Sequence, residues 1–334
     1  MGLRFPPDRR FPFFPSRPAA FPVSILAVGT TAFDSVETPF GNAERILGGS
    51  ATYLSLASRY FSDDVRLVGV VGHDFPDEYV ELLRERGIDL EGLEVDEDRE
   101  TFFWKGRYHD NLSIGERDTL ETRLGVVETF DPALPDSYRD SDIVALGNLD
   151  PEIQRHVLQQ VEAPELVICD TMNFWIESAL ESLRETLDQV DCLVINDTEA
   201  RQLSGEPNLI AAAAAVRAMG PERLVIKKGE HGALYFDDEG VFSVPAYPME
   251  NVHDPTGAGD TFAGGLAGFL DAQKALTREN VKRGIVYGSA LSSFVIEDFG
   301  PDRLLDLPNE EILERARAFR RLSEIPDLEP AYSA

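Results

Sequence analysis

The segment with the clearest capacity for chemistry is DPTGAGDTFAGG, residues 254–265. Gly257 and Gly259 flank Ala258, so the backbone can adopt unusual dihedral angles there and approach a ligand closely. A helix is predicted to begin at this turn, and its first amides have no partners within the helix. Together with the helix dipole they form a site suited to phosphate. Asp260 in that first turn could cap the helix, or it could take a proton from a hydroxyl beside a bound phosphate.

Two other glycine-rich patterns that bind phosphate are absent from the sequence. No G-x-x-x-x-G-K-[ST] segment occurs, which argues against a P-loop enzyme. The pair Gly257 and Gly259 lacks a third glycine at dinucleotide-binding spacing and stands late in the chain rather than after the first strand. A NAD-dependent oxidoreductase is therefore disfavoured.

Short apolar runs alternate with amphipathic stretches of helical spacing along most of the chain. This alternation predicts an α/β fold with a mainly parallel central sheet and helices on both faces. The predicted strands are 24–29, 65–72, 142–147, 165–170, 191–196 and 223–229, and the predicted helices are 51–61, 77–87, 153–161 and 175–187.

Two segments interrupt the alternation, at about 35–47 and 93–128. Both are extended in character, and the second contains aromatic and β-branched residues without a helical pattern. They predict a small separate β-sheet that either covers a substrate as a lid or decorates an edge of the main domain.

Polar residues that follow predicted strands form further candidate sites. Asn196 and Glu199 have the spacing of a helix capping box. The glycines of KGEHG, residues 228–232, predict a hairpin turn. Asp34 is interpreted as lying at the end of the first strand, where α/β sheets bind ligands and where a carboxylate can accept hydroxyl groups.

The segment 254–265 resembles the C-terminal signature of the PfkB, or ribokinase-like, carbohydrate kinase family. Residues 48–74, GGSATYLSLASRYFSDDVRLVGVVGHD, resemble the N-terminal signature of that family. The similarity runs from about residue 23 to about residue 320. It implies a ribokinase-like fold with a small β-sheet lid. It also implies an ATP-dependent phosphotransferase that uses Mg²⁺ and acts on a hydroxyl of a small sugar-like substrate.

The resemblance also implies roles for individual residues. Asp260 corresponds to the catalytic base, and the amides of Gly257, Ala258 and Gly259 correspond to the anion hole. On the nucleotide side it implies roles for Asn196, Glu199, Gly229 and Gly232, with Glu199 organising Mg²⁺ through water, and for either Lys227 or Lys228. On the acceptor side it implies roles for Asp34, Gly48 and Gly49, and it places Tyr53 beside them. Asp170 and Asn173, which follow another predicted strand, are further candidates for lining the cleft.

Tyr53 departs from the family pattern, which often has Asn at this position. A phenol cannot reproduce the paired donor and acceptor of an amide, which puts ribose or fructose specificity in doubt. A nucleoside or inositol kinase of the same fold therefore stays an alternative, as does a ligand sensor that has lost catalysis. The resemblance suggests a homodimer through the lid and leaves activation by a monovalent cation open.

The amino-acid composition limits which binding partners the chain can have. The chain of 334 residues has a net charge of −29, which disfavours nucleic acid and anionic membranes as partners. This acid excess suits a salty cytoplasm that screens self-repulsion. Cys169 and Cys192 lie in apolar runs and are predicted to be buried and free, which fits a cytoplasmic location. Residues 1–22 are predicted to be a disordered Pro- and Phe-rich tail, 23–325 the kinase domain, and 326–334 a C-terminal tail.

Overall fold

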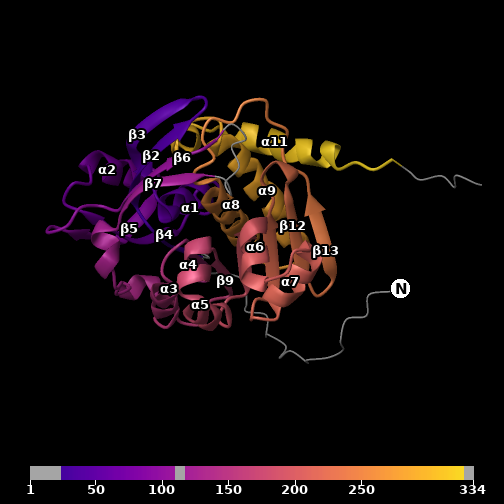
Figure 1. Cartoon of the computed structure of the whole chain (residues 1–334), viewed down its shortest axis with the longest axis horizontal. Coiled ribbons are helices and arrows are strands. Elements are labelled where there is room, and N and C mark those ends of the chain that lie inside the picture. Colours follow the sequence, from indigo (N-terminus) through magenta and orange to yellow (C-terminus); the bar gives the residue numbers. More distant parts are fainter. Residues whose placement is uncertain (1–23, 110–116, 327–334) are drawn as a thin grey trace, which may run out of the picture.

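The computed structural model describes residues 24–109 and 117–326. Its helices and strands assemble into a large and a small β-sheet with helices packed around the large one (Figure 1). The tail predicted at 1–22 lies outside the described residues, as does the tail predicted at 326–334 except for its first residue.

In the described part of the chain, nine strands form the large sheet in the order β13-β12-β11-β10-β9-β8-β1-β4-β5. The strands from β11 to β5 pair in parallel, and β12 and β13 add an antiparallel hairpin at one edge. Each predicted apolar run contains one of these strands, so the sequence located the centre of the sheet correctly. Their bounds are β1 Ile25–Val28, β4 Val65–Gly72, β5 Ile88–Asp96, β8 Ile143–Leu146, β9 Leu166–Cys169, β10 Cys192–Asn196, β11 Arg223–Lys227, β12 Ala233–Asp237 and β13 Gly240–Val244.

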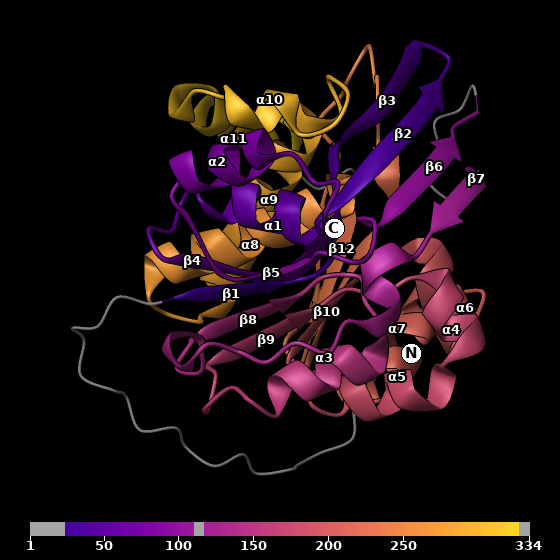
Figure 2. The same cartoon turned by 90° about the vertical axis from the view of Figure 1, so that its left-hand side faces the viewer.

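Helices cover both faces of the large sheet, as Figure 2 shows from the side. Successive residues of β1 explain the two layers: Ile25 packs into one hydrophobic cluster and Leu26 into the other, because side chains alternate across a strand. The helices α3 to α7 lie on one face, and α1, α2 and α8 to α11 lie on the other. Their bounds are α1 Ser50–Ser58, α2 Asp77–Glu85, α3 Pro151–Leu158, α4 Asn173–Ser178, α5 Leu180–Leu187, α6 Asp197–Ser204, α7 Leu209–Arg217, α8 Ala258–Gln273, α9 Arg278–Val295, α10 Asp302–Leu305 and α11 Asn309–Leu322.

One predicted helix is wrong in its extent. The stretch 175–187 is two helices rather than one, because the backbone leaves helical geometry at Ala179, with φ −138° and ψ 36°. The first of the two, α4, begins at Asn173 and so includes a residue predicted to line the cleft.

The small sheet has the strand order β3-β2-β6-β7, with bounds β2 Ala32–Thr38, β3 Gly41–Gly48, β6 Phe103–Arg107 and β7 Asp118–Arg123. Both predicted lid segments contribute strands to it. Only part of the second segment, 93–128, belongs to the small sheet, because β5 continues in the large sheet up to Asp96 and Gly125–Thr129 forms a 3₁₀ turn.

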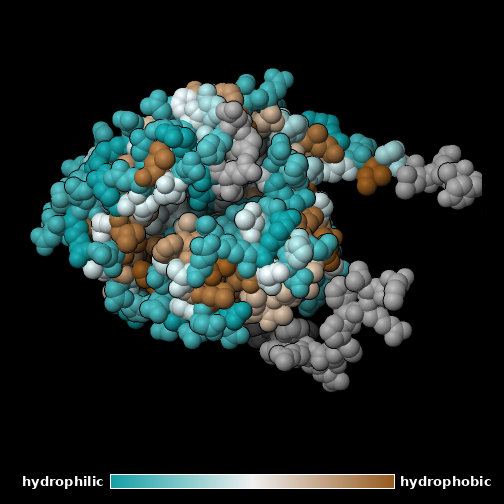
Figure 3. All heavy atoms as spheres, viewed as in Figure 1, coloured by the Kyte–Doolittle hydropathy of each residue, from teal (hydrophilic) through white to brown (hydrophobic). Residues whose placement is uncertain are grey.

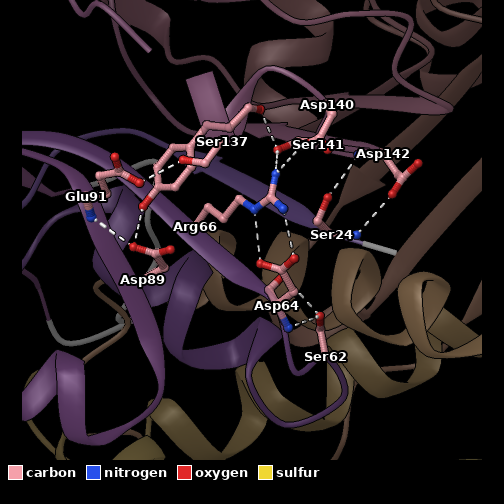
Figure 4. A network of polar contacts seen from close by, with 11 residues as sticks. Ser24, Ser62, Asp64, Arg66, Asp89, Glu91, Ser137, Asp140, Ser141 and Asp142 are labelled. Carbon is pink, nitrogen blue, oxygen red and sulfur yellow. Dashed lines mark hydrogen bonds and ion pairs between the residues drawn. The ribbon is translucent and has the colours of Figure 1, made fainter. Parts of the chain in front are cut away.

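A network of hydrogen bonds and ion pairs connects the amino-terminal ends of the central strands (Figure 4). The guanidinium of Arg66 on β4 donates to both carboxylate oxygens of Asp64, at 3.0 Å each, and to Asp140 at 2.8 Å. It also donates to Ser141, which precedes β8. These contacts fix the turns at the end of the sheet away from the candidate site.

Both cysteines are buried and free, as predicted. No helix in the described residues is long and apolar enough to cross a membrane.

Candidate active site

A cleft of about 3010 Å³ lies between the carboxyl ends of the parallel strands and the small sheet. Its walls come from both sheets and from the start of α8. Asp34 on β2, Trp104 on β6 and Thr122 on β7 occupy paired positions, so they share one face of the small sheet, and all three line the cleft. The small sheet therefore forms one side of the cleft.

The glycine-rich turn before α8 is held by Asp254, which is almost fully buried. Its Oδ1 accepts the amide of Thr256 at 2.9 Å and its Oδ2 accepts the amide of Gly300 at 3.2 Å. Gly257 has φ +75°, a conformation that favours glycine, and it is the N-cap of α8. The sequence predicted both the turn and the start of the helix.

The first turn of α8 points backbone amides at the cleft. The amide of Ala258 donates to the carbonyl of Pro255 at 3.3 Å, so it is already partly engaged. Helix geometry leaves the amides of Gly259 and Asp260 without an acceptor inside the helix. The amide of the N-cap residue Gly257 also lacks an acceptor within the helix, so the predicted set of 257–259 stays the candidate anion site.

Asp260 is the acidic residue of that first turn. Burial is the main cause that raises its pKa, to about 7, and the negative charge of Asp170 raises it further. The ammonium group of Lys227 acts in the opposite direction. A carboxyl group that titrates near neutral pH is a stronger base than an ordinary aspartate and still ionises under physiological conditions.

Lys227 and Asp170 form an ion pair beside the same turn. The Nζ of Lys227 donates to the Oδ2 of Asp170 at 3.0 Å, and both side chains are largely buried. A Cβ at Gly259 would lie 2.8 Å from that Nζ, so the ammonium group stands against the anion-binding turn. Burial alone would lower the pKa of Lys227, but Asp170 and Glu199 together raise it above its usual value.

Asn196 and Glu199 make the capping box that their spacing predicts. The Oδ1 of Asn196 accepts the amide of Glu199, and the Oε2 of Glu199 accepts the amide of Asn196, each at 2.8 Å. Asn196 pairs with Lys227 across β10 and β11, which places this box next to the ion pair. Burial, and then the charge of Asp170, raises the pKa of Glu199 to about 7.

Asp34 lies on β2 of the small sheet, so its predicted place at the end of the first strand of the main sheet is wrong. The difference arises because the chain turns out of the large sheet after Val28. Asp34 is buried against Gly48, where a Cβ would lie 2.1 Å from its Oδ2. Burial, followed by the charges of Asp254 and Asp260, raises the pKa of Asp34 to about 7.

Gly49 and Tyr53 complete the acceptor side. Gly49 has φ +95°, and a Cβ there would lie 2.3 Å from the carbonyl oxygen of Thr30, so only glycine fits. The ring of Tyr53 packs on Gly257, whose Cβ would lie 2.4 Å from it. The hydroxyl of Tyr53 is buried and has no hydrogen-bond partner among the described residues.

The remaining predicted residues also line the cleft. Gly229 has φ +53° and begins the 3₁₀ turn Gly229–His231 between β11 and β12. Gly232 has φ +81°, and a Cβ there would lie 2.1 Å from the carbonyl oxygen of Val244. Asn173 is exposed at the start of α4 and also lines the cleft.

The sequence did not single out two polar residues of the cleft. Arg117 carries a positive charge that lowers the pKa of Asp34, Asp260 and Glu199. Asn148, which follows β8, accepts a hydrogen bond from the indole of Trp175 at 2.9 Å. Asn148 could have been predicted from the sequence because it follows a central strand, as Asp170 does.

The model of the pfkB family carbohydrate kinases matches residues 25–307 of the chain. The chain belongs to this family. The cytidine kinase of Thermococcus kodakarensis is 27% identical over 254 residues, which cover 74% of this chain and 88% of that protein. The nucleoside kinase of Methanothermobacter thermautotrophicus is 29% identical over 297 residues, which cover 83% and 90%.

The fold agrees with that of a solved kinase structure. The nucleoside kinase of Burkholderia thailandensis in complex with inosine superposes with a TM-score of 0.72 at 20% identity, covering 90% of this chain and 98% of that one. The predicted ribokinase-like fold, with a mostly parallel sheet and a smaller separate sheet, is therefore confirmed. As a pfkB kinase, the chain is a phosphotransferase that acts on the hydroxyl of a sugar-like substrate, and the family implies ATP as co-substrate.

Proposed function

We propose that the chain transfers the γ-phosphoryl group of ATP to a hydroxyl of a nucleoside, with Asp260 as general base. The observation that supports this most is the position of Asp260, in the first turn of α8 and beside amides that have no helical acceptor. Phosphoryl transfer depends mainly on positioning and charge stabilisation, and this turn provides both a base and an anion site.

The choice of a nucleoside rests on the named relatives and on the cleft. Curated relatives include a cytidine kinase and two nucleoside kinases, each matched over at least 88% of its own length. The cleft walls carry Trp104 and Tyr108 from the small sheet side and Trp175 from α4. Such rings can stack on a nucleobase. Sugars and inositol stay the alternative acceptors, since the relatives include a ribokinase at 23% identity and an inositol 3-kinase at 25% identity.

On the acceptor side, Asp34 would accept hydrogen bonds from substrate hydroxyls, and the backbone at Gly48 and Gly49 would allow the substrate to approach. Both side chains line the cleft, and the charge of Asp260 contributes to raising the pKa of Asp34, which supports their placement around one bound hydroxyl. The small sheet would act as a lid that excludes water during transfer. A homodimer through this lid stays a prediction.

On the donor side, the nucleotide would lie along the turn after β11, with Gly229 and Gly232 allowing its close approach. The described residues contain no group of three or more His, Cys, Asp or Glu side chains placed to hold a metal. This fits Mg²⁺, which usually keeps several waters and binds through substrate phosphates and one or two carboxylates. Glu199 would supply that carboxylate through water, while its contact with the Asn196 amide fixes its orientation.

Replacing the base tests the proposal directly. Asp260→Asn removes the proton acceptor and keeps the shape, so turnover should fall by about 10²–10⁴-fold. ADP release from ATP and Mg²⁺ is measured across nucleosides, sugars and polyols in high-salt buffer. Asp306→Asn serves as the control, since Asp306 has a 92% exposed side chain and does not line the cleft.

A nucleoside-dependent release that Asp260→Asn abolishes and Asp306→Asn retains would support the proposal. Near-normal turnover in Asp260→Asn would contradict its role as base. A folded wild-type protein that releases ADP with none of these acceptors would favour a ligand sensor instead.

A further inference from the structure

The ion pair of Lys227 and Asp170 lies beside the start of α8, a position that the sequence around either residue does not predict. Lys227 ends β11 and Asp170 follows β9, so the two side chains meet across the end of β10 at the carboxyl edge of the sheet. Their contact is 3.0 Å, and the ammonium group lies against Gly259 at the start of α8. A buried cation is thus held where the helix amides would bind a phosphoryl group.

The surroundings of this cation are strongly acidic. Asp170, Glu199 and Asp260 all act on Lys227 through their charges. Burying an ion pair costs solvation energy that the attraction between the partners only partly offsets. Stability alone therefore does not explain this pair. A role in binding does, because the phosphates of a bound nucleotide carry more negative charge than Asp170 and would attract the ammonium group.

We propose that Lys227 is a catalytic residue that contacts the transferring phosphoryl group, and that Asp170 is a positioning residue that holds Lys227 in place until the phosphates arrive. This inference rests on the proposed phosphotransferase function. It also changes the predicted role of Asp170 from lining the acceptor site to orienting a cation.

The hydrogen bonds of Asp170 support this change. Its Oδ2 accepts from Lys227, and its Oδ1 accepts the amide of Thr171 at 2.8 Å. Both oxygens already have donors from the protein. Asp34 therefore fits the acceptor hydroxyls better than Asp170 does, because Asp34 lies in the small sheet that forms the other side of the cleft.

The step balances as follows. The acceptor oxygen forms a bond to the γ-phosphorus while the bond from that phosphorus to the β,γ-bridging oxygen breaks, and ADP leaves with the electron pair. The acceptor proton goes to the carboxylate of Asp260. Lys227 keeps its proton and donates hydrogen bonds to oxygens of the transferring group, whose charge it offsets in a site shielded from water.

Steady-state kinetics of the full chain test the proposal. Lys227→Met should lower kcat by about 10²–10³-fold, the usual loss for one stabilising donor. The KM for the nucleoside should change by less than about threefold, because the acceptor site is intact. Lys282→Met is the matched control: Lys282 forms an ion pair with Glu279 on α9, does not line the cleft and should leave kcat unchanged.

Two readouts separate a catalytic lysine from a structural one. In Lys227→Ala, added ethylamine should restore part of kcat in a concentration-dependent way. The acid limb of the pH profile of kcat/KM should also shift, and the shift should have opposite directions in Lys227→Met and in Asp170→Asn. It moves to higher pH in Lys227→Met, because the cation that lowers the pKa of Asp260 is gone, and to lower pH in Asp170→Asn, because an anion that raises it is gone.

Binding measurements keep the two proposals distinct. ADP with aluminium fluoride mimics the planar transferring group, and Lys227→Met should lose at least about tenfold more affinity for it than for ADP alone. A wild type that turns over no nucleoside contradicts the proposed acceptor, yet this comparison still tests Lys227. Equal losses for both ligands, or a kcat in Lys227→Met within about threefold of wild type, would overturn the inference.

Discussion

Tyr53 is a cleft residue with a buried polar group that has no partner among the described residues. Its side chain is 1% exposed, and its hydroxyl has no hydrogen-bond partner in the described parts of the chain. Burial, and then the charges of Asp34, Asp254 and Asp260, raises its pKa, so the phenol stays protonated and able to donate. A buried donor without an acceptor costs about 1–3 kcal/mol, which suggests that a ligand supplies the acceptor.

Removing this hydroxyl should separate stability from function. Tyr53→Phe deletes an unsatisfied group, so the free energy of unfolding should stay the same or rise by about 1 kcal/mol, while the acceptor KM rises by about three- to tenfold. Urea unfolding and steady-state kinetics measure the two effects.

Tyr138→Phe provides the contrast. Tyr138 is also fully buried, but its hydroxyl donates to Asp89 at 2.9 Å and accepts the amide of Gly92 at 3.3 Å. This variant should lose about 1–2 kcal/mol of stability and keep the acceptor KM. Equal destabilisation in both variants would mean that the Tyr53 hydroxyl has a partner in the free protein.

For single residues, the sequence predicted most reliably those features of the site that form between residues close together in the chain. The turn at 254–257 and the capping box at Asn196 follow from neighbours in the chain, and the structure has both. The contacts of Asp170 depend on β9 and β11 lying on either side of β10, which no local pattern reveals. The same holds for the charge of Arg117, which comes from a distant segment.

At the scale of elements, the helix that carries Asp260 is positioned by close backbone packing. A Cβ at Gly264 would lie 2.3 Å from the carbonyl oxygen of Leu54 on α1. One turn later, a Cβ at Gly268 would lie 2.6 Å from the carbonyl oxygen of Ser58. Glycine thus lets α8 approach α1, the helix that carries Tyr53, so the base and the acceptor side are held by one helix contact.

Filling this contact should therefore affect stability and catalysis together. Gly264→Ala places a methyl group against backbone that cannot move cheaply, so the free energy of unfolding should fall by about 1–3 kcal/mol. The shift of α8 should also lower kcat. Gln273→Ala, at the exposed end of the same helix, should change stability by less than about 0.5 kcal/mol. If Gly264→Ala is as stable as wild type, the two helices have room that the structure does not show.

The sequence predicted the buried strands better than the small sheet. Strands of the large sheet are covered on both faces, so each is a short continuous apolar run that stands out in the sequence. Strand β7 is exposed along its whole length, and its residues carry no apolar signature. Strand β5 lies at the sheet edge, and only Ile88 and Gly92 of it are buried. Its end therefore lacks the continuous apolar run of the central strands and is not separated from the lid segment by sequence alone.

At the scale of the whole molecule, negative charge is the dominant property. Asp and Glu number 60 against 31 Lys and Arg, and hydrophilic residues cover most of the face in Figure 3. Local crowding is visible at Asp302, whose pKa is raised by burial and by the charges of Asp298 and Asp306. Self-repulsion of this kind destabilises the compact state.

Salt should therefore stabilise the fold. The distance over which exposed charges interact falls from about 10 Å at 0.1 M salt to about 3 Å at 1 M, so the urea midpoint at pH 7.5 should rise as KCl increases over this range. Repeating the titration at the isoelectric point, about pH 4.4, provides the control. There the net charge is small, and KCl should change the midpoint much less. A midpoint at pH 7.5 that is flat or falls with KCl would show that local ion pairs such as Arg66 with Asp64 outweigh the net repulsion, because salt weakens such pairs.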